Sequence, residues 1–96
     1  MIIILLVIKT FCQEGDGNGK EKPVGKANNV DDCVRKVRLG HPRANGVTFK
    51  DCGGDKDKDP TCGNCFAEYD MDGSNGHEDF KSCFIKIGRI CGLYTE

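Results

Sequence analysis

Cysteine is the most informative residue type in this chain, because seven of its 96 residues are cysteines. A cytosolic domain of this size usually carries few of them. Small exported domains use disulfides to compensate for the limited apolar surface that a short chain can bury. The length allows one small domain. We therefore predict a secreted, extracellular protein whose fold depends on disulfide bonds.

Residues 1–12 have the features of a signal peptide. Residues 1–8 are apolar, but this run is far shorter than the roughly 20 residues that a membrane-spanning helix needs. Thr10 and Cys12 are small residues at the positions that precede a cleavage site, which predicts cleavage before Gln13. Cleavage would remove Cys12 and leave six cysteines, an even number that can pair completely.

The chain after this cleavage site is expected to have two parts. Residues 13–28 contain four glycines, one proline and only two apolar side chains, Val24 and Ala27. Such a segment cannot bury enough surface to offset the entropy lost on ordering, so we predict that it is disordered or is a propeptide. Residues 29–96 then form a six-cysteine module.

The first ordered element of this module is expected to be a helix. Asn29 is a suitable cap, with Asp32 three residues later, and apolar residues then recur at helical spacing. Gly40, followed by His41 and Pro42, is a typical helix end. In residues 43–60 we expect a loop, within which only residues 47–50 have the composition of a strand.

Two further short helices are predicted from apolar stripes in the second half of the chain. Thr61 can cap the first of them, and Asn75 can cap the second, which would end at Gly92. The two stripes consist of Cys62, Cys65, Phe66 and Tyr69, and of Phe80, Cys83, Phe84, Ile87, Ile90 and Cys91.

The predicted fold class is therefore a small disulfide-rich, mainly α protein, with about three short helices stapled by three disulfides. Three helices of this length bury too little surface to be stable alone, and each predicted helix carries at least one stripe cysteine. Six cysteines permit fifteen pairings, and the sequence does not choose among them. The paired residues are expected to be Cys33, Cys52, Cys62, Cys65, Cys83 and Cys91.

Charge is distributed unevenly along the chain. Residues 33–50 contain five basic side chains and no acidic one, whereas residues 51–79 contain nine acidic side chains and two lysines. A basic face could steer the protein toward an acidic partner. Alternatively, the two segments simply pair with each other in surface ion pairs. If binding occurs, we expect it to use the outer face of the first helix and the loop after it, at Arg35, Lys36, Arg38 and Arg43.

Two short motifs suggest chemistry, but each lacks part of its context. Cys62-Gly-Asn-Cys65 has redox spacing without the preceding strand of a thioredoxin-like site, and in an exported chain its thiols would oxidise before they bound zinc. Residues 70–78 resemble the start of an EF-hand loop. Lys81 stands where that family closes the shell with a glutamate. We therefore expect no metal, no cofactor and no catalytic residues.

The remaining function classes are those of secreted binding peptides. The chain is similar in general plan to the cysteine-rich peptides of animal venoms and secretions, with a hydrophobic leader, a polar stretch and a six-cysteine module. This predicts a non-enzymatic, monomeric venom-type or defence peptide that binds a membrane protein such as an ion channel or receptor. A secreted signal, such as a pheromone or hormone, and an extracellular calcium-linked matrix protein are the alternatives. No nucleic-acid-binding motif is present.

Overall fold

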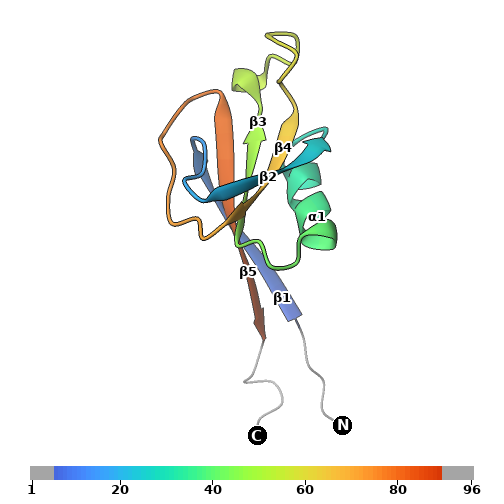
Figure 1. Ribbon diagram of the computed structural model, residues 1–96, viewed down its shortest axis with the longest axis vertical. Helices are drawn as coiled ribbons and strands as arrows, with labels where there is room; N and C mark the ends of the chain where they lie inside the picture. The colour runs from blue at the N-terminus through green and yellow to red at the C-terminus, as the bar shows by residue number, and fades with distance from the viewer. Residues whose placement is uncertain (1–5, 90–96) are drawn as a thin grey trace, which may run out of the picture.

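The computed structural model describes residues 6–89, which form one antiparallel sheet and a single α-helix (Figure 1). The predicted mainly α fold is therefore wrong. The order across the sheet is β1-β5-β3-β4-β2, and every pair of neighbouring strands is antiparallel. In chain order the elements are β1 (Leu6–Glu14), β2 (Lys20–Lys26), α1 (Val30–Gly40), β3 (Gly46–Lys50), a 3₁₀ turn (Cys52–Gly54), β4 (Asn64–Tyr69) and β5 (Phe80–Arg89).

Helix α1 has the limits that the sequence predicted. The side chain of Asn29 accepts a hydrogen bond from the backbone N–H of Asp32 at 2.8 Å, and the N–H of His41 closes the other end on the carbonyl of Val37. The helix packs on one face of the sheet (Figure 1). Its buried residues and those of the central strands form the apolar core, which includes Cys33, Val34, Val37, Val47, Phe49, Cys65, Ala67 and Cys83.

The opposite face of the sheet is more polar. Thr48, Glu68 and Ser82 are all fully buried, although none of them faces the apolar core. The loop between β1 and β2 covers part of this face, because the backbone N–H of Gly17 donates to the Thr48 hydroxyl at 2.9 Å. The loop between β4 and β5 joins it through the bridge between Gly17 and Ser74.

Residues expected to form the second and third helices are strands β4 and β5. Both strands bury residues on both of their faces: Cys65, Ala67 and Glu68 on β4, and the adjacent Ser82 and Cys83 on β5. A strand covered on both sides loses the alternation of apolar and polar residues that marks a half-exposed strand. Its apolar residues then match helical spacing by coincidence.

Two segments that were not expected to be structural form the edges of the sheet. Residues 6–14, most of which were assigned to the signal peptide, are strand β1. Residues 20–26, within the segment expected to be disordered, are strand β2. Strand β2 carries lysines, Pro23 and a bulge between Pro23 and Gly25, and φ at Gly25 is +109°. These features discourage pairing with another chain at an exposed edge.

Three disulfides join these elements. Cys33–Cys65 ties α1 to β4, Cys52–Cys62 closes the loop between β3 and β4, and Cys12–Cys83 ties β1 to β5. Five of the six cysteines expected to pair are therefore in bridges. The sixth, Cys91, lies outside the described residues. Cys83 is bonded to Cys12, which was expected to be removed with the signal peptide. The three bonds are compatible with an extracellular or secreted protein.

Candidate functional site

A cavity of about 570 Å³ lies where three segments meet. Strand β2 contributes Lys20, Glu21 and Lys22, β4 contributes its last residue, Tyr69, and the turn after α1 contributes residues 40–43. This turn exists because Gly40 ends the helix and Pro42 cannot continue it. The volume falls within the range of sites that bind small molecules or single side chains.

The Tyr69 ring is part of the cavity wall. Its hydroxyl shares a hydrogen bond with Nδ1 of His41 at 3.1 Å, and the two rings meet edge to face with centroids 6.5 Å apart. The ammonium group of Lys22 lies 5.8 Å from the centroid of the tyrosine ring. The cavity therefore combines an aromatic surface, held in place by a histidine, with a cation directly above it.

The cavity has an excess of positive charge. Lys20, Lys22 and Arg43 line it together with one acid, Glu21. Among residues 6–89, no ion pair involves any of these three cations. Three unpaired cations around an aromatic ring are suited to bind an anionic group, such as a carboxylate, that carries an apolar or hydroxylated body.

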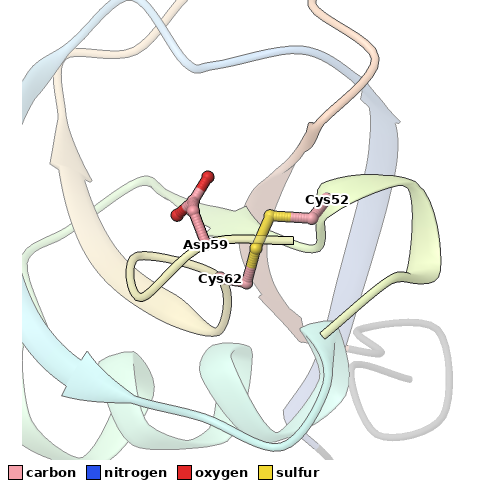
Figure 2. A group of neighbouring side chains, drawn as sticks. All are labelled: Cys52, Asp59 and Cys62. Atoms are coloured by element: carbon pink, nitrogen blue, oxygen red, sulfur yellow. A yellow bond between two sulfur atoms is a disulfide. The ribbon is translucent and has the colours of Figure 1, made fainter. Parts of the chain in front are cut away.

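Cys52, Asp59 and Cys62 form a second cluster, with the composition of a metal site (Figure 2). The two sulfur atoms are bonded to each other. A disulfide offers no thiolate to a metal, because the thiolate is the form that coordinates. The cluster is therefore a structural bridge beside a carboxylate.

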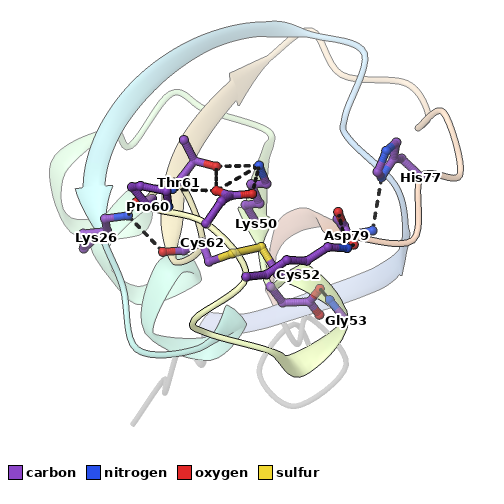
Figure 3. Close-up of polar contacts among 12 residues, drawn as sticks. Lys26, Lys50, Cys52, Gly53, Pro60, Thr61, Cys62, His77 and Asp79 are labelled. Carbon is purple, nitrogen blue, oxygen red and sulfur yellow. Dashed lines mark hydrogen bonds and ion pairs between the residues drawn. A yellow bond between two sulfur atoms is a disulfide. The ribbon is translucent and has the colours of Figure 1, made fainter.

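The loop around this bridge also encloses a smaller cavity, of about 270 Å³. Two of its lysines are already engaged (Figure 3). Lys26 donates to the carbonyls of Pro60 and Cys62, and Lys50 bonds to Asp59 and Thr61. Hydrogen bonds from the hydroxyl and N–H of Thr61, followed by Lys50, lower the pKa of Asp59 to about 2. These cations hold the loop in place, so we assign the cavity at Tyr69 as the candidate site.

The four basic residues predicted to bind a partner have different surroundings in the structure. Arg35 and Lys36 both pair with Asp32 on their own helix. Arg38 is exposed and borders a separate hollow beside Leu39, and only Arg43 lines the cavity at Tyr69. The two charged segments meet in one ion pair, Lys50–Asp59, and the acidic segment also pairs in Lys58–Asp79 and Lys81–Asp51.

Sequence reasoning missed most of the site. Lys20 and Lys22 lie in the segment expected to be disordered, and Tyr69 was assigned to the apolar stripe of a helix. The sequence does hold one signal. Residues 20–22 alternate lysine with an acid and are followed by Pro23 and Val24, a pattern that an edge strand can show.

The segment that resembles an EF-hand loop has a structural role. The side chain of Asn18 accepts from the N–H groups of Asp72 and Gly73, and its amide donates to the carboxylate of Asp72. The Ser74 hydroxyl donates to the carbonyl of Glu14 at 2.7 Å. Two side chains at the expected ligand positions thus attach this loop to the end of β1 and to the loop that follows it.

No protein-family model, curated protein or solved structure matches this chain. In the part of the chain that the structure describes, no helix is both long and apolar enough to cross a membrane.

Proposed function

We propose that this protein is a secreted, non-catalytic binding module that docks on an acidic segment of a membrane protein such as an ion channel or receptor. The proposal covers both a venom or defence peptide and a secreted signal, because both would act through such a contact. The cavity at Tyr69 is the docking site, and the disulfide-bonded sheet is the rigid support that keeps it preformed.

The observation that carries this proposal is the set of unpaired cations around Tyr69. Elsewhere in residues 6–89, several lysines and arginines are already paired with carboxylates or carbonyls of the protein itself. Lys20, Lys22 and Arg43 are left to attract an outside anion. The His41–Tyr69 hydrogen bond fixes the ring against which the body of that ligand would pack.

Binding of an oligoglutamate peptide, measured by isothermal titration calorimetry at low salt, tests the proposal. Oligolysine of equal length is the charge-reversed control. We expect Arg43→Ala and Lys22→Ala each to weaken binding about 2- to 5-fold, the value of an exposed charge pair. Added salt should weaken it further.

Arg35→Ala is the matched control, since this arginine is also an exposed cation but pairs with Asp32. It should bind the peptide as the wild type does. Equal losses in Arg35→Ala and Arg43→Ala would mean that net charge alone attracts the peptide. Unchanged binding in Arg43→Ala and Lys22→Ala would remove the cavity as the docking site.

A further inference from the structure

Three carboxylates converge on the polar side of the sheet. Asp16 comes from the loop between β1 and β2, Glu21 from β2 and Glu68 from β4, and one oxygen of each lies within 4.8 Å of the others. Glu21 and Glu68 are directly opposite each other in the antiparallel pair of strands. The sheet itself therefore holds two of these acids together, against their mutual repulsion.

One carboxylate oxygen of Glu68 has no hydrogen-bond partner within the cluster. Its side chain is fully buried, and its Oε2 accepts a hydrogen bond from the Thr48 hydroxyl at 2.7 Å. Its other oxygen, Oε1, is buried without any hydrogen-bond partner, as is Oδ1 of Asp16. A buried carboxylate oxygen normally has a hydrogen-bond partner, because an oxygen without one costs its full desolvation penalty.

The charges of the cluster point the same way. Three carboxylates whose oxygens lie this close repel one another when all are ionised. A positive ion at the same place would neutralise the acids and complete the coordination of the two unpartnered oxygens.

We propose that Asp16, Glu21 and Glu68 bind a calcium ion. All three offer carboxylate oxygens, with no sulfur or nitrogen in the set, which favours a hard cation over zinc or copper. Glu21 is exposed, so water can reach the ion and fill its remaining coordination positions. None of the three carboxylates comes from the segment that resembles an EF-hand, although Glu21 also lines the cavity at Tyr69.

Calorimetric titration of the full chain with calcium chloride, after treatment with a chelator, tests this site. We expect one calcium per chain, with a Kd of about 0.1–1 mM, the range of extracellular modules. Saturating calcium should also raise the melting temperature by about 5–10 °C. Glu21→Gln should weaken binding at least tenfold, and because Glu21 is exposed this variant should still fold.

Glu68→Gln provides a second variant that keeps the shape of the buried side chain and its contact with Thr48. It should also lose calcium binding. Asp70→Asn, at the start of the EF-hand-like segment, is the control and should bind calcium as the wild type does. No heat signal and no change in melting temperature in the wild type would overturn the proposal. Binding that Asp70→Asn abolishes and Glu21→Gln retains would also overturn it.

Discussion

Gly17, in the loop between β1 and β2, lies close against Thr48 and Glu68 of the sheet. A Cβ atom built there would lie 2.4 Å from the sulfur of Met71, 2.9 Å from Oγ1 of Thr48 and 3.0 Å from Cδ of Glu68. We expect Gly17→Ala to lower the free energy of unfolding by about 1–3 kcal/mol through overpacking, as measured by urea denaturation. Gly40→Ala is the control, because a Cβ there meets nothing within 4 Å. A Gly17→Ala variant as stable as wild type would mean that the loop is not seated on Thr48.

Asp59 gives a second prediction at the scale of one residue. Its folded pKa of about 2 lies below the unfolded value of 3.8, so its ionised form stabilises the fold above the unfolded value. This contribution should be lost as the pH falls from 3.8 through 2. We expect Asp59→Asn to flatten the fall in stability across this acid range, as followed by urea denaturation at several pH values. Carbon-detected NMR titration of the carboxyl group should give the low pKa directly. A titration near the unfolded value would contradict the Thr61 and Lys50 contacts.

At the scale of elements, the sequence predicted α1 well because its information is local. The Asn29 cap, the apolar stripe and the Gly40 end all lie within one short segment. The strands depend on partners far away in the chain. Strand β3 was expected to be at most a short strand within a loop, yet it is central, because β4 and β5 flank it on either side. Neither partner was expected to be extended.

The candidate site was hard to predict for the same reason. Two of its three cations come from β2, and the ring comes from β4. These strands are distant in sequence and meet only through strand pairing, where Lys20 is opposite Tyr69. Arg43 was identified because it follows the predicted end of α1. The other three predicted basic residues lie on the same helix but face different surroundings, which helical spacing alone does not reveal.

The disulfides between elements should differ in their effect on stability. Cys33–Cys65 spans 32 residues of sequence and Cys52–Cys62 spans 10. In the chain-entropy account, removing the longer bridge should cost about 1 kcal/mol more, from a total of about 3–4 kcal/mol. We therefore expect the pair Cys33→Ala and Cys65→Ala to unfold at lower urea concentration than the pair Cys52→Ala and Cys62→Ala. Both Cys33 and Cys65 are also buried in the core, which increases the difference. If the variant without Cys52–Cys62 unfolded at the lower urea concentration, this would indicate that α1 is held by packing alone.

For the whole molecule, processing and disulfide pairing are linked. Cleavage before Gln13 would remove Cys12, the partner of Cys83 in the structure. We expect digestion of the chain that retains residues 1–12, without reduction, to yield a linked pair of peptides that contain Cys12 and Cys83 when analysed by mass spectrometry. The complete pairing of the six remaining cysteines after cleavage stays a prediction. A linked Cys83–Cys91 pair in the retained chain would contradict the β1–β5 bridge.

Strands β1 and β5 bring the two ends of the described chain together, with Leu6 opposite Arg89 (Figure 1). A pulling force on these ends would open the hydrogen-bonded ladder like a zipper, one pair at a time, from Leu6–Arg89 to Phe11–Phe84. At Cys12–Cys83 the tension would pass through the disulfide bond. The chain between the two cysteines would then carry no load. In an optical trap we expect one short, low-force extension in the oxidised protein and full unravelling only after reduction. A tether at these ends would therefore leave the cavity at Tyr69 mechanically undisturbed.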